Sequence, residues 1–252
     1  RLVKENSKFK TSLVRLVDIV FPELPKIVSS VAQKSCLALL YELPSTKDIA
    51  ECNLTHLTHL LSDNSNKKFN REKAIQIREL ARKSIGLNSN SVSLELKQTI
   101  SIIRFIQEQL DDVEKRIKEI LKEINSPILT IPGISFKTAG SILAEIGDIS
   151  RFDSPAKLLA FAGLDPSMYQ SGKFFSTHSV MVKRGSKYLR FALMTAARMV
   201  CLNDVTFNEF KNKKMAEGKH YMVTMGHVAK KLVRVIYYLL KTNNVYQANK
   251  VA

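Results

Sequence analysis

The stretch from Ile131 to Ala197 decides the character of this chain. Its marked segments are IPGISFKTA at 131–139, GLDP at 163–166, QSG at 170–172 and KRGSKYLR at 183–190. A Pro-Gly turn that leads into a helix start can hold a phosphate on its backbone N–H groups. The basic run opens an Ala-rich helix. Together these segments point to DNA bound through its backbone, with a serine placed to attack it.

The charge of the chain supports that interpretation. Its 252 residues are 45% hydrophobic, enough for a folded core, and carry a formal net charge of +16. Residues 125–252 contain eighteen Lys and Arg against seven Asp and Glu, which places +11 of that charge in the second half. Such an excess is typical of proteins that bind nucleic acids, although a generally basic protein is the alternative. We expect DNA to contact mainly the second half.

Cysteine usage and hydropathy argue against several classes of protein. Cys36, Cys52 and Cys201 are widely separated, lack metal-ligand spacing and fit a reducing cytosol. No apolar run approaches the roughly 20 residues of a membrane-spanning helix. The histidines are scattered, and the converging carboxylates of a two-metal nuclease are not found. We therefore expect a cytoplasmic protein without membrane contact and without a metal site in this chain.

Hydrophobic periodicity predicts a mainly α fold with little sheet. Helices are expected at 1–20, 27–43, from Ser45 onward, 54–61, 70–85, 140–146, 155–163, 185–200, 208–214 and 221–240. Ser45 and Asp48 predict a helix start, and Gly86 is expected to cap the helix over 70–85. Residues 165–180 lack a helical period, which predicts a loop or a small irregular hairpin about Gly172.

A heptad pattern predicts a coiled coil over residues 91–125. Apolar residues recur every seven positions, with a second set between them: Leu96, Ile103, Leu110, Ile117 and Ile124, then Thr99, Ile106, Val113 and Ile120. This seam must pair with another helix, either within the chain or on a second copy, and we expect pairing between copies. The coiled coil would then separate a helical segment at 1–90 from a C-terminal domain at 126–252.

The turn around Gly133 resembles a helix-hairpin-helix, in which backbone N–H groups hold one DNA phosphate. Gly133 permits a close approach, and Lys137 and Thr138 lie in the first turn of the following helix. Ser135 stands where the familiar form of this turn has a second glycine. The alternative is an ordinary Pro-Gly turn between core helices.

Ser171 is the candidate nucleophile, because it precedes a flexible glycine in a basic stretch. A serine that attacks a phosphodiester needs cations on the non-bridging oxygens, where charge develops in the transition state. The cations expected to contact DNA are Lys173, Lys183, Arg184, Lys187 and Arg190. On residue types alone Ser171 also fits an ordinary turn serine. The rival serines in the same stretch are Ser176, Ser179 and Ser186.

Several motifs occur in the order found in one family of mobile-element proteins. They are IPGI at 131–134, AEIGD at 144–148, RF at 151–152, LAFAGLDP at 159–166, QSG at 170–172 and KRGSKYLR at 183–190. Together they resemble the C-terminal domain of insertion-sequence-110 transposases, the bridge-RNA-guided recombinases of bacterial and archaeal mobile elements. FPEL at 21–24 and the heptad segment also fit, so the resemblance covers nearly the whole chain.

The resemblance implies a two-part active site. In the family a RuvC-like N-terminal domain supplies four acidic metal ligands, and the C-terminal domain supplies a serine that joins DNA covalently. The Ser-Gly pattern puts that serine at Ser171. The chain begins at Arg1, which we expect to lie just after the last acidic ligand, so Mg²⁺ is expected only with the preceding domain. Val182 departs from the serine that is common at this position in the family.

From the resemblance we expect the coiled-coil and C-terminal portion of a DNA transposase that cuts and rejoins DNA through a phosphoserine link. Its expected partners are DNA, a guide (bridge) RNA and further copies of itself in a dimer or tetramer, in a bacterial or archaeal cytoplasm. The segment alone is expected to be inactive. The alternative is a non-catalytic DNA-binding module or a decayed transposase.

Overall fold

Helices form almost all of the regular structure. A computed structural model describes residues 1–166, 170–171, 174–175 and 181–248. These residues contain eleven α-helices, three short 3-10 helices and one pair of two-residue strands, which confirms the predicted mainly α fold. Contacts within the chain divide it into two compact units, Arg1–Val113 and Glu114–Ala252. The division falls inside one long helix rather than at residues 90 and 125.

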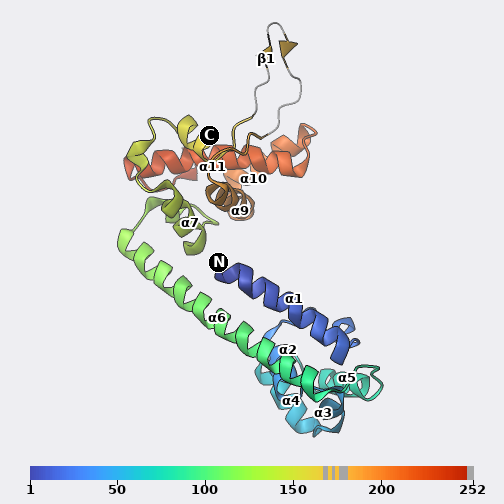
Figure 1. Ribbon diagram of the computed structural model, residues 1–252. Coiled ribbons are helices and arrows are strands. Elements are labelled where there is room, and N and C mark those ends of the chain that lie inside the picture. The colour runs from blue at the N-terminus through green and yellow to red at the C-terminus, as the bar shows by residue number, and fades with distance from the viewer. Residues whose placement is uncertain (167–169, 172–173, 176–180, 249–252) are drawn as a thin grey trace. The chain divides into compact units, whose positions relative to one another are not determined.

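The first unit packs short helices around one apolar core (Figure 1). Its elements are α1 (Leu2–Val20), η1 (Leu24–Lys26), α2 (Lys34–Glu42), α3 (Thr46–Glu51), α4 (Leu54–Asp63), α5 (Arg71–Arg82) and the beginning of α6 (Asn90–Ile124). The most deeply buried side chains come from all parts of this unit, and include Leu13, Phe21, Leu39, Leu57, Ile77 and Ile100. Burial of these apolar surfaces is the main source of the unit's stability.

Local signals predicted some helix ends and missed others. Ser45 and Asp48 form a capping box, in which Ser45 Oγ accepts from Asp48 N at 3.1 Å. The helix expected from residue 27 begins only at Lys34. Gly86 is not a helix cap, because α5 ends at Arg82. A methyl group on Gly86 would lie 1.8 Å from the carbonyl oxygen of Val20, so close packing explains this glycine.

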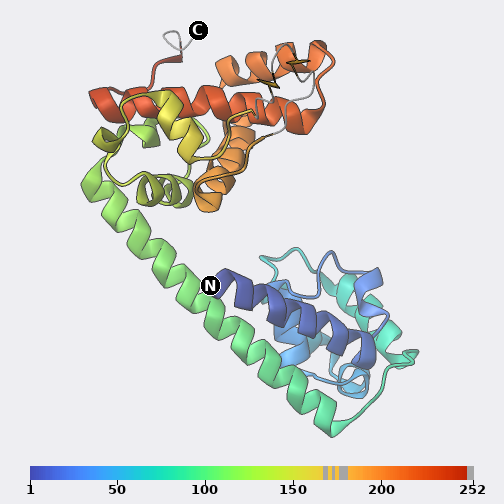
Figure 2. The same ribbon diagram turned by 45° about the horizontal axis from the view of Figure 1, so that its top comes forward.

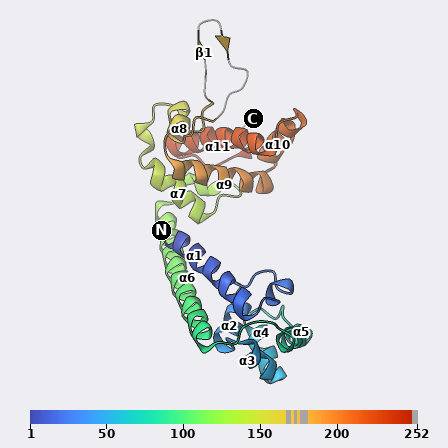
Figure 3. The same ribbon diagram turned by 45° about the vertical axis from the view of Figure 1, so that its right-hand side comes forward.

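The first part of the predicted heptad seam is buried within its own chain. Leu96, Ile103 and Ile106 are 0%, 2% and 7% exposed, and the first two belong to the apolar core of the first unit. Helix α1 runs antiparallel to this part of α6 (Figures 1 and 3). Asn6 Nδ2 donates to Gln107 Oε1 across the contact, at 3.3 Å. Pairing within the chain therefore covers this half of the seam.

The second part of the seam is largely uncovered in the single chain. Val113, Ile120 and Ile124 are 48%, 40% and 58% exposed. A straight helix turns about 20° per heptad relative to a strict seven-residue repeat, so later seam positions leave the buried face. With two neighbours they form an exposed apolar row, here called the outer stripe: Ile102, Phe105, Val113, Ile120 and Ile124.

None of the helices in the described ranges is long and apolar enough to span a bilayer.

The second unit is organised around an Ala-rich helix. Its elements are the end of α6, η2 (Pro127–Thr130), α7 (Phe136–Ile146), η3 (Ile149–Arg151), α8 (Pro155–Phe161), β1 (Gln170–Ser171), β2 (Phe174–Phe175), α9 (Lys187–Asn203), α10 (Val205–Ala216) and α11 (Tyr221–Thr242). Helix α9 packs against α7, α10 and α11, and α8 lies on α11 (Figure 2). Ala192, Ala196 and Ala197 are almost completely buried, so small side chains let these helices approach closely.

Candidate functional site

The turn before α7 is held by its own side chains. Gly133 has φ of +93° and precedes Ser135, which is the N-cap of α7. Ser135 Oγ accepts from Thr138 N at 3.3 Å, and the two hydroxyl oxygens lie 3.1 Å apart. These contacts satisfy one of the free N–H groups at the helix start. The resemblance of this turn to a phosphate-binding helix-hairpin-helix stays a prediction.

Gly133 has a structural role that the sequence did not reveal. A methyl group at this position would lie 2.6 Å from the carbonyl oxygen of Met199, which belongs to α9. The turn therefore contacts the backbone of α9 directly, and any side chain would separate the two. Packing alone accounts for glycine here, independently of a phosphate contact.

Lys137 is already paired within the chain. Its ammonium forms an ion pair with the carboxylate of Glu114 on α6, and both side chains are about half exposed. A solvent-exposed pair of this kind contributes little to stability, so a phosphate could replace the carboxylate at low cost. The structure thus places Lys137 on the surface beside the α7 start, together with Ser135 and Thr138.

Two chain segments pair at the base of the predicted hairpin. We call them the neck, formed by residues 161–166 and 181–186. Val182 N donates to Asp165 O at 2.9 Å, Lys183 N to Gly163 O at 3.2 Å, and Ser186 N to Phe161 O at 2.8 Å. Pro166 and Met181 form an antiparallel bridge above these bonds. The neck fixes where the intervening residues 167–180 leave and re-enter the helical unit.

Two glycines allow the neck to close. Gly163 has φ of +65°, and a methyl group there would lie 2.1 Å from Arg184 O. Gly185 has φ of +101°, and its methyl group would lie 2.2 Å from Phe161 O. Each glycine combines a left-handed backbone with contact against the opposite segment. The glycines of the GLDP and KRGS motifs are therefore explained by backbone conformation and by the close contact between the two segments.

Arg190 locks the neck from α9. Its Nη1 donates to Ala162 O at 3.2 Å and to Lys183 O at 3.1 Å, so one guanidinium nitrogen joins the two segments. The sequence predicted Arg190 as a DNA contact. The structure gives it partners within the protein, and the predicted DNA contact remains untested.

Ser186, one of the rival nucleophiles, is an N-cap in this structure. Its Oγ accepts from Leu189 N at 3.0 Å and donates to Glu145 Oε2 at 2.5 Å, which joins the start of α9 to α7. Nothing in the sequence indicated this role of Glu145. A serine directly before the expected helix was an available signal for the cap, but the partner on α7 lies 41 residues away.

Three further predicted cations lie within or next to the neck. Lys183, Arg184 and Lys187 are all exposed, and Lys187 is the first residue of α9. Lys183 has φ of +57°, a left-handed conformation uncommon for a residue with a side chain. The positive charges thus lie at a helix N-terminus, where an anion also interacts favourably with the backbone.

The predicted hairpin exists at Ser171. Strands β1 and β2 are antiparallel, with Gln170 opposite Phe175 and Ser171 opposite Phe174, which brackets Gly172 as predicted. The structure describes the backbone of Ser171 in this pair. Lys173, Ser176 and Ser179 lie outside the described residues. Within the described ranges, no group of three or more His, Cys, Asp or Glu side chains is arranged to hold a metal ion.

Replacement of Arg190 by alanine should loosen the neck. We expect Arg190→Ala to lower the free energy of unfolding by about 1.5–3 kcal/mol, because two carbonyls lose a charged donor. Hydrogen exchange at the amides of Val182 and Lys183 should accelerate. Arg198→Ala removes the same charge from an exposed position of the same helix, and should change stability by less than about 0.5 kcal/mol. Equal exchange rates in the two variants would contradict a locking role for Arg190.

Comparison with known proteins connects this region to mobile elements. Residues 125–213 match the sequence model described as the transposase IS116/IS110/IS902 family. This match includes the turn at Gly133, the neck, the strand pair and most of α9 and α10. It is therefore centred on the features from which the candidate site is built.

Several curated proteins are similar over more than half of the chain. A 43.6 kDa uncharacterized protein of insertion element IS110 from Streptomyces coelicolor is 26% identical over 164 residues, covering 64% of this chain and 40% of that protein. The pilin gene-inverting protein of Moraxella bovis is 30% identical over 151 residues, covering 57% and 47%. The transposase of IS1328 from Yersinia enterocolitica is 29% identical over 151 residues, covering 56% and 44%.

The matched region spans less than half the length of each of these relatives. Their names include both transposition and gene inversion, two forms of DNA rearrangement. Over residues 125–213 the chain is therefore similar to the transposase IS116/IS110/IS902 family, and the names of its relatives also belong to insertion elements and DNA inversion.

Proposed function

We propose that this chain is the DNA-binding and nucleophile-bearing part of an insertion-element transposase. The observation that carries the proposal is the neck. It pairs two segments of the family-matched region through backbone hydrogen bonds, and the exposed cations Lys183, Arg184 and Lys187 lie within or next to one of these segments. A loop held in this way can present a side chain to a phosphate that the surrounding cations bind.

In the proposed reaction Ser171 supplies the attacking oxygen. Its Oγ forms a bond to phosphorus, one P–O bond of the DNA backbone breaks, and the leaving oxygen is protonated to an alcohol. The broken strand stays attached to the protein as a phosphoserine ester. Attack on this ester by the hydroxyl of another DNA end releases Ser171 and rejoins the strand, so no external energy source is needed.

The proton on Ser171 requires a base, and we propose that the acidic RuvC-like half supplies it from outside these 252 residues. Bound Mg²⁺ ions there would lower the pKa of a coordinated oxygen and stabilise the phosphorane-like transition state. The basic residues at the neck would hold the non-bridging oxygens. On this proposal the present chain binds DNA by itself but does not cleave it.

The covalent link gives a direct test for Ser171. The chain would be joined to the proposed acidic RuvC-like half. The combined protein would then be incubated with the RNA of the insertion element and with DNA that contains the ends of that element. We expect a protein–DNA adduct on a denaturing gel. Ser171→Ala should abolish the adduct and leave DNA affinity within about twofold, because the hydroxyl serves bond formation rather than backbone binding.

Variants at the rival serines serve as matched controls. Ser176→Ala and Ser179→Ala should retain the adduct. Loss of the adduct in one of these, with retention in Ser171→Ala, would move the nucleophile but keep the reaction. An adduct that survives every serine change would refute the serine mechanism, and the chain would then be better described as a DNA-binding module.

Binding to duplex DNA should depend steeply on salt. Each phosphate that a cation neutralises contributes about −0.9 to the slope of log K against log salt concentration. The triple variant Lys183→Ala, Arg184→Ala, Lys187→Ala should therefore flatten the slope by up to about 2.7. Fluorescence anisotropy over a salt series measures this slope.

An equally charged variant separates local contact from net charge. Lys67, Lys68 and Lys83 are exposed in the first unit, and their replacement by alanine removes the same three charges. We expect this control to keep the wild-type slope within about 0.5. Equal slopes for both triple variants would show that the neck cations do not contact DNA.

We also propose that copies of the chain associate through the outer stripe, and that a guide RNA joins the assembly. An exposed apolar row on a long helix is a typical contact for a second helix. Guide RNA is testable in the adduct assay, where its omission should prevent adduct formation. The stripe is testable by sedimentation.

Two charges in the outer stripe should separate the copies. We expect the wild-type chain to sediment as a dimer or tetramer at micromolar concentration and Val113→Asp with Ile120→Asp to sediment as a monomer, because a charge in a dry contact is costly. Both residues are exposed in the single chain, so the fold should persist in circular dichroism. Lys115→Gln with Lys122→Gln alters the net charge equally on the polar face and should leave assembly intact. A monomeric wild type would refute the proposal.

A further inference from the structure

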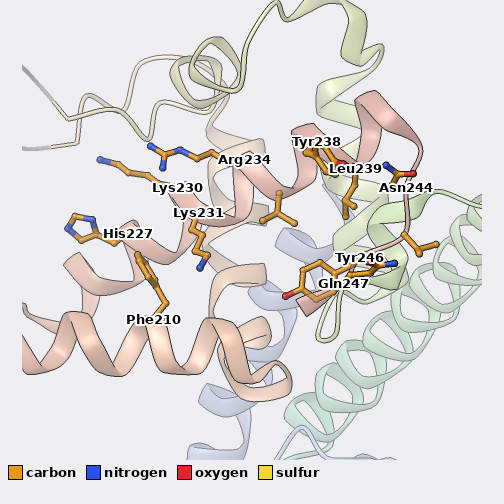
Figure 4. A pocket seen from close by; sticks show the side chains of 12 residues that line it. Phe210, His227, Lys230, Lys231, Arg234, Tyr238, Leu239, Asn244, Tyr246 and Gln247 are labelled. Atoms are coloured by element: carbon orange, nitrogen blue, oxygen red, sulfur yellow. Dashed lines mark hydrogen bonds between the residues drawn. The ribbon is translucent and has the colours of Figure 1, made fainter. Parts of the chain in front are cut away.

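A pocket in the second unit has no part in the reaction proposed above. It lies between α10, α11 and residues 244–247, with a volume of about 620 Å³ (Figure 4). That volume is within the range of sites that hold small molecules or single groups of larger ligands. Twelve described residues line the pocket, and none of them carries a carboxylate.

One wall of the pocket is basic. His227, Lys230, Lys231 and Arg234 all come from α11, where residues three or four apart lie on neighbouring positions of one face. Lys230 and Arg234 extend side by side from the helix, whereas Lys231 extends toward Phe210 on α10 (Figure 4). The ammonium of Lys231 lies 5.0 Å from the centre of the Phe210 ring. Among the described residues, Lys230 and Arg234 have no ion-pair partner, whereas Lys231 is held on an aromatic face.

His227 lies close to several charged groups. Burial lowers the pKa of this histidine, the ammonium groups of Lys230, Lys219 and Lys214 lower it further, and the carboxylate of Glu217, which pairs with Lys214 and Lys219, partly opposes them. The ring is thus favoured in its neutral form. The arrangement suits an anionic ligand that relieves the repulsion among these groups.

The aromatic part of the lining consists of Tyr238, also on α11, and of Tyr246, which is fixed in place. Tyr246 O–H donates to the buried carboxylate of Asp204 at 3.0 Å, and its backbone N–H donates to Thr130 Oγ1 at 2.8 Å. Its ring stacks on Phe207 with centroids 6.4 Å apart. Asn244 Nδ2 donates to Tyr238 O–H at 3.4 Å. These contacts hold residues 244–247 against the helices as a preformed side of the pocket.

We propose that this pocket binds an unpaired nucleotide of a single-stranded nucleic acid. The base would lie against the rings of Tyr238 and Tyr246, and Lys230 and Arg234 would bind the adjoining phosphates. Aromatic surface next to cations is the arrangement by which proteins hold single strands without sequence preference. A paired base cannot enter, because its faces are already stacked within the duplex. An acidic peptide would use the cations but would leave the aromatic wall without a partner.

The inference goes beyond the proposed transposase reaction and is independent of Ser171. Base and phosphate are shared by RNA and DNA, so the structure defines the chemistry of the ligand rather than its sugar. Parallel measurements on the two kinds of strand identify the sugar. The triple neck variant, which lacks Lys183, Arg184 and Lys187, tests whether the pocket works separately from the neck.

The test uses the 252-residue chain and labelled oligonucleotides of about eight nucleotides, oligo-U and oligo-dT, with a duplex as comparison. We expect Tyr238→Ala to weaken single-strand binding about tenfold, since a stacking surface is lost. Tyr238 is 56% exposed, so its removal should not unfold the chain. Lys230→Ala with Arg234→Ala should weaken binding at least as much. Tighter binding of oligo-U identifies ribose and tighter binding of oligo-dT identifies deoxyribose, and either outcome supports the proposal.

Charge-matched and chemical controls decide the outcome. Lys157→Ala with Lys241→Ala removes two exposed charges of the same unit outside the pocket, and should change affinity less than about twofold. Equal losses in the two double variants would overturn the proposal, as would an unchanged affinity in Tyr238→Ala. An octa-glutamate peptide that displaces the strand at equal concentration would identify an acidic peptide as the ligand instead.

Photo-crosslinking of an oligonucleotide that contains 4-thiouridine gives a readout that does not depend on variant stability. We expect the crosslinked peptide to contain Tyr238 or Tyr246. Crosslinks confined to other parts of the chain would overturn the assignment. The triple neck variant should keep this crosslink, and its loss would show that the strand binds at the neck.

Discussion

The candidate site depends on the close contact between the two segments of the neck. At Gly163 and Gly185 each segment lies so near the backbone of the other that even a methyl group would overlap a carbonyl oxygen. Backbone hydrogen bonds then set the register, and Arg190 joins two carbonyls on opposite segments. The close steric contact at the two glycines sets how near the segments lie, and the hydrogen bonds of Arg190 then hold them together. These contacts fix the base of the hairpin that contains Ser171.

The same helix supports the turn at Gly133. The Gly133 turn packs against the backbone of α9 at the carbonyl of Met199. Ser186 is the N-cap of this helix, and Arg190 donates from it to the neck. The Ala-rich face of α9 makes these contacts possible, because short side chains let neighbouring backbones approach. The turn at Gly133, the neck and Lys187 at the start of α9 are therefore connected through one helix. On the function proposed above, DNA bound at one of them would meet the others in a fixed geometry.

Basic residues of this chain have distinct physical environments, although the sequence shows only their number. Lys137 is paired with Glu114, Arg190 is bound to carbonyls, and Lys231 and Lys187 each lie near an aromatic ring. Lys183, Arg184 and Lys187 are exposed within or next to the neck. Only cations without strong internal partners can neutralise phosphate without first losing such a contact. The proposed DNA and single-strand sites follow from this difference.

The sequence alone determined the mainly α fold and the capped helix start at Ser45, and it predicted a loop or hairpin about Gly172, because periodicity, capping and turn chemistry are local. Motifs in order also indicated the resemblance to insertion-element transposases. Only the tertiary structure decided that Gly86 and Gly133 serve packing, that Ser186 binds Glu145, and that the first part of the heptad seam is buried in the core of the first unit. These depend on residues far apart in the chain. No local pattern records which distant backbone a glycine must meet, or how far a straight helix rotates its seam away from the core.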